Sequence, residues 1–395
     1  MRLGRRDFGR RDFGRRDFVK LAAGAGALPL LSSTTLAQLA PNPPNIRPPS
    51  PAERGAMARL AHSFMDKYGV PALSFAIGYA GTVVHEDAFG LADIERNEAV
   101  TPRHLFRIAS VSKMITSVTI FRLIEENRLK LTDRVFGPGA LLGTDYGQSP
   151  YSDGIDQITL EHLLTHTAGG WSNDSRDPMF THPRMDHAEL IAWTLANRPL
   201  DRPPGQRYAY SNFGYCVLGR VIEKLTGQPY AEHARTDVLA RCSVTDMTIA
   251  DNTRDQRQAG EVVYYGQGEN PYGMNVRRMD SHGGWIATPS DLVQFLMHVD
   301  GYTRPANILR PRTIEVMTTA PSYSPDYAKG FCVNKSGNWW HNGSLPGTST
   351  IAVRTHGGFC WAAFTNTRRR NSDMDGDLDN LNWNMARQVG EWRVA

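Results

Sequence analysis

The stretch that most strongly indicates the fold is residues 106–114, which read Phe-Arg-Ile-Ala-Ser-Val-Ser-Lys-Met. Ser110 is expected to open a helix, and Lys113 follows one turn later, with side chains about 5–6 Å apart on one face. A serine hydroxyl is a weak nucleophile until a base accepts its proton, and a buried, neutral lysine is such a base. The apolar residues after Lys113 favour a buried helix. The alternative is a helix-capping serine followed by a solvated lysine, since S-x-x-K tetrapeptides are common.

Two further motifs follow along the chain. Residues 210–212 read Tyr-Ser-Asn just before an apolar helical pattern, so Tyr210 is placed to relay a proton and Asn212 to donate its amide to a substrate carbonyl. Residues 341–343 read His-Asn-Gly at the end of a predicted strand, where a glycine lets a ligand approach the backbone closely. Taken alone, the first of these also fits a helix start with a packed tyrosine.

In this order, S-x-x-K, Y-x-N and H-x-G resemble the motifs of the serine β-lactamase and penicillin-binding-protein superfamily. The branch with the greatest similarity is the class C β-lactamase-like group, which includes DD-peptidases, D-aminopeptidases and esterases. The resemblance extends over about residues 53–392. Its framework segments are 70–74 (Val-Pro-Ala-Leu-Ser), 87–93 (Asp-Ala-Phe-Gly-Leu-Ala-Asp), 163–170 (Leu-Leu-Thr-His-Thr-Ala-Gly-Gly) and 283–292 (Gly-Gly-Trp-Ile-Ala-Thr-Pro-Ser-Asp-Leu).

The resemblance implies an α+β fold of the β-lactamase/transpeptidase type, an antiparallel sheet flanked by helices with an inserted, mainly helical lobe. It implies a serine hydrolase that forms an acyl-enzyme through Ser110 and needs no metal or organic cofactor. Lys113 and Tyr210 would share the general acid and base work, with the division between them open. Asn212 would orient the substrate amide, and the backbone N–H groups of Ser110 and Ser344 would form the oxyanion hole.

His341 departs from the family pattern, because true class C β-lactamases carry the lysine of a K-T-G motif at this place. A neutral imidazole binds a β-lactam or peptide carboxylate less well than a permanent cation does. We therefore expect a carboxylesterase or a D-amino-acid peptidase of the DD-carboxypeptidase type, with β-lactamase activity less favoured. The residues expected to bind substrate are Asn212, His341, Gly343 and Ser344.

Other functions and sites fit parts of the sequence. The alternative function is a catalytically silent, penicillin-binding-like protein of the cell envelope, which the intact set of Ser110, Lys113 and Tyr210 opposes. His162 and His166 have a spacing that suits metal ligands, but no H-E-x-x-H is present, and we expect them to cap and pack. An α/β-hydrolase would need a G-x-S-x-G motif after a strand, which the sequence lacks.

Charged, aromatic and thiol side chains elsewhere favour structural roles. The charged runs 174–177 and 368–370 are expected to be solvated loops, with contact to a ligand as the alternative. Alternation along a strand favours core packing for Trp339 and a cleft-lining position for Trp340. The cysteines are too few and scattered for a disulfide scaffold, and we favour free, buried thiols. They are Cys216, Cys242, Cys332 and Cys360.

The N-terminal residues resemble an export signal. Residues 4–18 repeat Gly-Arg-Arg-Asp-Phe three times, and a short segment of small and apolar residues leads to Ala37. A charged region followed by an apolar one is typical of a secretory signal, and R-R-D-F-V-K resembles the twin-arginine motif. This predicts a bacterial protein that is exported folded to the periplasm or the medium, with residues 1–37 removed. The alternative is a basic, disordered tail.

Patterns of apolar residues predict the organisation of the remaining chain. Residues 38–52 are rich in proline and predict an extended spacer. Strand patterns lie at both ends of the mature chain, and helix patterns lie between them. We therefore expect an α/β sheet lobe from residues 53–131 and 321–395, and a mainly helical lobe from 132–320.

Composition excludes several classes of protein. Eight of the 44 Lys and Arg residues but only three of the 40 acidic ones fall in residues 1–37, so the formal net charge of +4 belongs to the leader. A nearly neutral body is not expected to bind nucleic acid. No apolar run reaches the ~18–20 residues that span a bilayer as a transmembrane helix. The expected partner is a small ester, peptide or β-lactam substrate, and the oligomeric state stays open.

Overall fold

The computed structural model of the chain describes residues 46–147 and 150–393. The predicted signal peptide (1–37) and the first part of the proline-rich spacer (38–52) therefore lie outside the described residues. Of the helices within the described ranges, none is long and apolar enough to cross a membrane.

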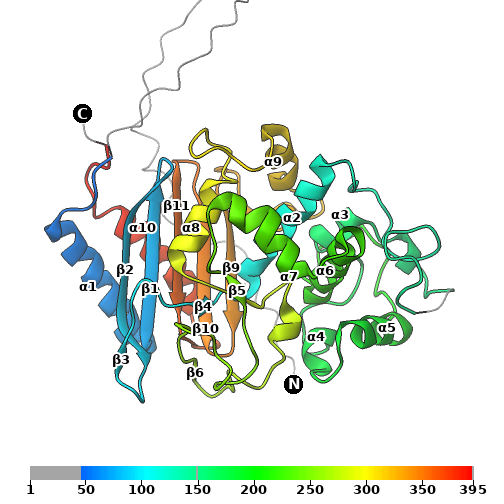
Figure 1. The fold of residues 1–395 in the computed structure, drawn as a ribbon, viewed down its shortest axis with the longest axis horizontal. Helices are drawn as coiled ribbons and strands as arrows, with labels where there is room; N and C mark the ends of the chain where they lie inside the picture. The colour runs from blue at the N-terminus through cyan, green and yellow to red at the C-terminus, as the bar shows by residue number, and fades with distance from the viewer. Residues whose placement is uncertain (1–45, 148–149, 394–395) are drawn as a thin grey trace, which may run out of the picture. The chain divides into compact units, whose positions relative to one another are not determined.

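A seven-stranded antiparallel sheet joins the two ends of the described chain (Figure 1). Its strand order is β3-β2-β1-β11-β10-β9-β8, so β1 from the N-terminal part pairs directly with β11 from the C-terminal part. The strands are β1 (Ala72–Tyr79), β2 (Thr82–Asp93), β3 (Glu98–Ala99), β8 (Cys332–Val333), β9 (Trp339–Leu345), β10 (Thr348–Arg354) and β11 (Phe359–Thr365). The sheet predicted from both ends of the sequence is confirmed.

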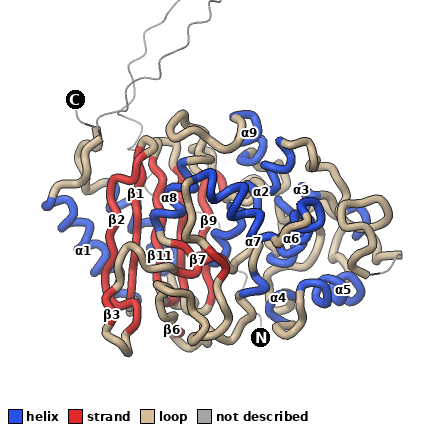
Figure 2. Tube along the Cα trace, in the orientation of Figure 1, coloured by secondary structure: helices blue, strands red, loops and turns tan. Residues whose placement is uncertain are grey.

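Helices cover both faces of this sheet and form the neighbouring lobe (Figure 2). The helices are α1 (Pro51–Tyr68), α2 (Ser112–Glu125), α3 (Leu160–Leu164), α4 (Pro178–Thr181), α5 (His187–Asn197), α6 (Asn212–Thr226), α7 (Tyr230–His233), α8 (Pro289–Met297), α9 (Pro311–Thr318) and α10 (Met374–Ala386). Two small sheets complete the fold. They are β4 (Phe106–Arg107) with β7 (Trp285–Ala287) and β5 (Thr248–Ile249), and β6 (Tyr265–Gly266) with β12 (Thr367–Arg368).

The helix that was expected to open at Ser110 begins instead at Ser112. Residues Ala109–Val111 form a 3₁₀ turn, η2, and Ala109 has a φ of 47°, in the left-handed region. A residue in that conformation cannot belong to a right-handed α-helix, so α2 begins only after the turn. Ser110 is thereby placed in the turn that leads into the buried helix.

A row of small residues lets α8 approach the sheet. Ala76 pairs with Ala362, and Ala362 pairs with Ala352, so three methyl groups lie side by side on one face. α8 packs on β1, β10 and β11, and a Cβ at Gly78 would lie 2.6 Å from Val293 Cγ1. Larger side chains here would hold the helix away from the strands. The opposite face packs against α1 and α10.

Two placements differ from the predictions. Residues 132–320 were assigned to the helical lobe, yet α8 within them covers the sheet, because its apolar face fits the small residues of the central strands. Trp340 was expected to line a cleft, but it packs against the core that α1 and α10 form with the sheet. Trp339 packs against the main core on the other face, as predicted.

Gly343 is required by the approach of the protein's own backbone. β9 lies against η2, and a Cβ at position 343 would clash with the carbonyl oxygen of Ile108 and with Thr350 Oγ1. The sequence pattern indicated a glycine that makes room for a ligand; the structure shows that it makes room for the segment leading to Ser110.

We predict that Gly343→Ala separates β9 from η2 and lowers the free energy of unfolding by about 1–3 kcal/mol. Urea unfolding followed by circular dichroism measures this change. Gly376→Ala is the matched control, because a Cβ at that exposed position of α10 meets nothing within 4 Å. The control should be neutral or more stable by up to about 1 kcal/mol. Equal stability of the two variants would contradict the close contact.

Candidate active site

The structure brings together the alcohol, amine and phenol that the motifs indicated. Lys113 lies in the first turn of α2, fully buried, with its Nζ 3.1 Å from Ser110 Oγ. Tyr210 comes from the segment before α6, and its ring centre lies 4.8 Å from Lys113 Nζ. The Tyr210 side chain also makes a hydrogen bond with Ser110. Ser110 and Tyr210 are each partly exposed, so a substrate can reach this side of the group.

Two carbonyl oxygens complete the surroundings of the Lys113 amine. Nζ lies 2.8 Å from Asn212 Oδ1 and 2.9 Å from the backbone oxygen of His282. Burial lowers the pKa of Lys113 well below its usual value, although the negative charge of Asp177 opposes this effect. A neutral amine has two N–H groups and one lone pair. When both N–H groups bind the two carbonyl oxygens, the lone pair is left for the hydroxyl of Ser110.

Tyr210 has the opposite protonation behaviour. Burial raises the pKa of its phenol well above the usual value, while the hydrogen bond with Ser110 opposes this effect. The ring packs at 4.3 Å from that of His166. A phenol that stays protonated donates a proton more readily than it removes one, so Lys113 and Tyr210 fit the roles of base and acid respectively.

His341 lines the site, and both of its ring nitrogens are hydrogen-bonded within the protein. Its Nδ1 is 2.6 Å from the Asn342 carbonyl oxygen, which can only accept, so Nδ1 carries the hydrogen. Nε2 therefore accepts from the Tyr327 hydroxyl at 3.2 Å. Burial lowers the pKa of His341 to about 3. The ring is 2% exposed and neutral, so it is unable to bind a substrate carboxylate as a cation.

Asn212 is held by a carboxylate whose contact with it the sequence did not predict. Asn212 Nδ2 donates to Asp177 Oδ2 at 2.9 Å, and both residues are buried. Asp177 caps α4, because its Oδ1 accepts from the Met179 N–H at 2.9 Å. The run 174–177 was expected to be a solvated loop, which is wrong for Asp177. The bond to Asp177 uses one of the two N–H groups of the Asn212 amide, so the expected role of Asn212 in orienting a substrate amide stays a prediction.

Ser344 lies beside a guanidinium that is paired with a carboxylate. Its Oγ accepts from Arg368 Nη1 at 3.4 Å, and Arg368 binds Glu269 through two hydrogen bonds of 2.6 Å each. Arg370 Nη1 is 3.6 Å from the same carboxylate. The run 368–370 was expected to be a solvated loop, which holds for the exposed Arg369 and Arg370 but not for Arg368, which lies in β12 and pairs with Glu269.

Threonines of β10 hold the segment that leads to Ser110. Thr348 Oγ1 donates to the carbonyl oxygen of Arg107, and Thr350 Oγ1 donates to that of Ile108, each at 2.9 Å. Both hydroxyls are buried, so these bonds give each of them an acceptor inside the protein. The backbone before the turn η2 is therefore fixed to the sheet.

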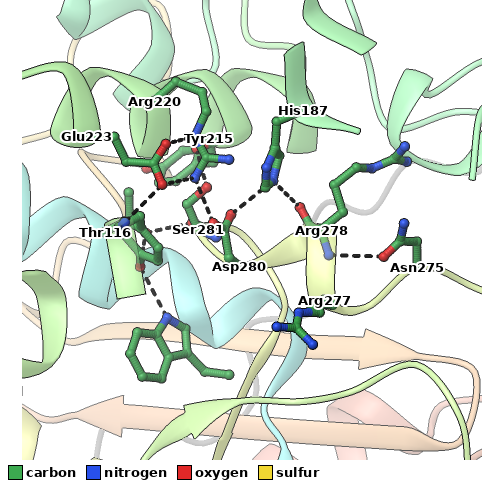
Figure 3. A network of polar contacts seen from close by, with 12 residues as sticks. Thr116, His187, Tyr215, Arg220, Glu223, Asn275, Arg277, Arg278, Asp280 and Ser281 are labelled. Carbon is green, nitrogen blue, oxygen red and sulfur yellow. Dashed lines mark hydrogen bonds and ion pairs between the residues drawn. The ribbon is translucent and has the colours of Figure 1, made fainter. Parts of the chain in front are cut away.

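A polar network holds the loop that supplies the His282 carbonyl (Figure 3). Arg220 of α6 donates to Asp280 Oδ2 at 2.6 Å, and the Arg220 side chain is 3% exposed. Thr116 of α2 donates to the backbone oxygen of Ser281 at 2.6 Å. The residues before His282 are thus bound to both helices that frame the amine of the site.

The other residues considered as metal ligands or disulfides have structural roles. His162 forms a capping box with Thr159, and His166 Nδ1 accepts from the Ser211 N–H at 3.1 Å, so capping and packing are confirmed. No cluster of three or more metal-ligating side chains occurs within the described ranges. The cysteines are free thiols, three buried and one half-buried, as favoured. They are Cys216, Cys242, Cys360 and the half-buried Cys332.

Comparison with known proteins decides the family. A family model described as Beta-lactamase matches residues 57–382. The chain belongs to the beta-lactamase family. It is 25% identical over 207 residues to Protein flp of Staphylococcus aureus (strain MRSA252). That match covers 52% of this chain and 40% of the relative, so the chain spans less than half of that protein's length.

Several solved structures share the fold of this chain. D-amino acid amidase from Ochrobactrum anthropi SV3, complexed with L-phenylalanine amide, aligns with a TM-score of 0.69 at 20% identity, over 86% of this chain and 99% of that one. FmtA from Staphylococcus aureus aligns with a TM-score of 0.68 at 18% identity, over 89% and 93%. The octameric penicillin-binding protein homologue from Pyrococcus abyssi gives 0.66 at 22%, over 80% and 73%. The β-lactamase/transpeptidase-like fold is thereby confirmed.

We predict that Asp280→Asn lowers the free energy of unfolding at pH 7 by about 1.5–3 kcal/mol, because it removes the more buried of the two carboxylates that bind Arg220 and leaves only the half-buried Glu223. Burial opposes ionisation of Asp280, but the charge of Arg220 lowers the pKa of this carboxyl below its usual range. The stabilisation is therefore present above about pH 4 and is lost as the pH falls toward the folded-state value.

Urea unfolding at pH 7 and at pH 3 measures this effect, with Asp255→Asn at an exposed position as the control. The difference between Asp280→Asn and the wild-type chain should narrow at pH 3. A loss no larger than that of the control at pH 7 would show that the ion pair does not stabilise the loop.

Proposed function

We propose that the chain is a serine hydrolase that forms an acyl-enzyme through Ser110 at an ester or amide carbonyl. The observation that carries this proposal is the 3.1 Å approach of Lys113 Nζ to Ser110 Oγ, in a site where the other two contacts of the amine are carbonyl oxygens. Membership of the beta-lactamase family supports the same chemistry.

Each group has a step in this reaction. Lys113 accepts the Ser110 proton as Oγ attacks the carbonyl carbon, and the backbone N–H groups of Ser110 and Ser344 bind the oxygen that becomes negative. Tyr210 donates its proton to the leaving group and recovers one from the Lys113 ammonium. Water then attacks the acyl-enzyme by the reverse sequence, so that Ser110 regains its proton and the carboxylic acid leaves.

The lining of the site favours substrates without a free carboxylate beside the scissile bond. His341 is neutral and enclosed, and Arg368 is bound to Glu269, so neither offers a free cation. Peptides with a C-terminal D-residue and β-lactams both carry such a carboxylate. We therefore favour a carboxylesterase or a hydrolase of D-amino-acid amides and peptides, over a DD-carboxypeptidase or a β-lactamase. Similarity in fold to a D-amino acid amidase fits this substrate class.

We also propose export of the protein to the periplasm or the medium. The support is the sequence of residues 1–37, with its repeated Gly-Arg-Arg-Asp-Phe and the small, apolar segment that follows. Detection of the mature N-terminus in a periplasmic fraction would test this proposal.

We predict that Ser110→Ala lowers turnover of a short-chain p-nitrophenyl ester by about three orders of magnitude or more, since the nucleophile is removed. A fluorophosphonate probe followed by peptide mass mapping should label Ser110 in the wild-type chain. Ser336→Ala, at an exposed loop position, should keep full turnover and labelling.

In a panel with a D-amino-acid amide, a D-Ala-D-Ala peptide and nitrocefin, the ester and the amide should be turned over fastest. A folded wild-type chain with neither label nor turnover would favour the silent binding protein.

We predict that kcat/KM rises with pH along one acidic limb and then stays level to about pH 9.5. Burial lowers the pKa of Lys113, so the neutral base is lost only as the pH falls, and burial raises the pKa of Tyr210, so the acid is retained at alkaline pH. Initial rates with an amide substrate measure this profile without background hydrolysis. A steady rise up to pH 10 would indicate an unshifted lysine or a phenolate base, and would contradict these roles.

A further inference from the structure

We propose that Asp177 is a positioning residue that selects the orientation of the Asn212 amide, and so leaves the lone pair of Lys113 for Ser110. This inference rests on the proposed function, because it assumes that Lys113 removes the proton of Ser110. Asp177 itself lies behind Asn212 and is fully buried, so it acts through Asn212 and not by touching substrate.

The direction of the hydrogen bonds follows from the chemistry of a carboxylate. Burial raises the pKa of Asp177 to about 6, despite the hydrogen bonds from Asn212 and Met179, so the group is ionised at pH 8. An ionised carboxylate only accepts hydrogen bonds. A side-chain amide has nearly the same shape in its two orientations, and its partners decide between them. Asp177 therefore requires the nitrogen of Asn212 to face it, which turns the oxygen of Asn212 toward Lys113.

The reverse orientation would disable the base. Asn212 Nδ2 would then lie at the 2.8 Å contact with Lys113 Nζ, where it would donate to the lone pair of the neutral amine. One N–H group of Lys113 would still bind the His282 carbonyl, and the other would point to Ser110. In that arrangement the lysine donates to the serine and is unable to accept its proton.

Asp177 is also the charged group among the neighbours of Lys113. The titratable side chains that face Lys113 are Asp177, His166, Tyr210, Tyr215, His282 and His341. Burial lowers the pKa of each of the three imidazoles and raises that of both phenols, so these five are uncharged at neutral pH. Removal of the Asp177 charge should therefore lower the pKa of Lys113 further.

The test replaces Asp177 with asparagine, which keeps the shape but offers an NH₂ group to Asn212. We expect Asp177→Asn to lower kcat for ester hydrolysis by roughly 10–10³-fold with little change in KM, as when an orienting carboxylate is lost and the base is held in the wrong state. The acidic limb of kcat/KM should move to lower pH. Asp174→Asn is the matched control, since Asp174 belongs to the same loop but is exposed and pairs with Arg176. The Asp174→Asn control should leave both kcat and the acidic limb of the kcat/KM profile unchanged.

A double variant that exchanges the residues at 177 and 212 distinguishes an effect on the orientation of the amide from a loss of protein stability. In Asp177→Asn combined with Asn212→Asp, the amide at 177 donates to a carboxylate at 212, which again presents an oxygen to Lys113. This double variant should recover most of the activity at alkaline pH, with its acidic limb moved to higher pH because the negative charge now touches Lys113. Urea unfolding shows whether Asp177→Asn is folded. If the single variant is unfolded, the activity of the double variant tests the positioning role.

Failure of the positioning role can be distinguished from failure of the proposed function. Wild-type kcat and an unchanged limb in a folded Asp177→Asn variant would overturn the positioning role, while loss of activity in Ser110→Ala would still support the hydrolase. A folded double variant that is inactive from pH 7 to pH 10 would likewise overturn it. Full turnover by Ser110→Ala would instead remove the proposed function itself.

Discussion

The structure depends on the burial of one amine. Lys113 Nζ lies in the interior, and an amine taken out of water destabilises the fold unless its N–H groups find acceptors. The two acceptors lie 99 and 169 residues further along the chain, on Asn212 and on the His282 backbone. The base therefore exists only when α2, α6 and the loop before β7 are packed together. Burial then keeps the amine neutral, so the contact that completes the fold also creates the chemistry.

Opposite sides of the site are fixed by different parts of the fold. On the side of the sheet, Thr348 and Thr350 of β10 hold the carbonyl groups just before the turn η2. On the side of the helical lobe, the Arg220–Asp280 ion pair holds the loop that ends in His282. Proton transfer needs heavy atoms within about 2.6–3.2 Å of each other, a tolerance that one flexible loop does not hold. Anchoring from both sides explains why buried polar groups gather around an otherwise apolar core.

Sequence patterns predict the parts of this site that depend on local spacing. Ser110 and Lys113 are three residues apart, and apolar runs at both ends of the chain predict a shared sheet. The hydrogen-bond partners of Lys113 cannot be predicted from local spacing in the sequence. A backbone carbonyl such as that of His282 has no side-chain signal, and the Asp-Pro step at Asp177 predicts a helix cap but not a contact with Asn212, 35 residues away. Likewise, alternation places Trp340 on one face of β9, but it does not show that both faces of the sheet are covered.

The neutral His341 leaves burial as the cause that keeps Lys113 uncharged. A cation on β9, as in the K-T-G pattern of the family, would repel the protonated form of Lys113 and help to keep it neutral. His341 is uncharged and bound to Tyr327, so that help is missing and burial must supply the whole effect. The rings of Tyr210 and Tyr215 lie over the amine, and exclude water from it. The same replacement removes an anchor for a substrate carboxylate. The neutral imidazole on β9 thus leaves the base dependent on burial, and it fits a site suited to uncharged acyl groups.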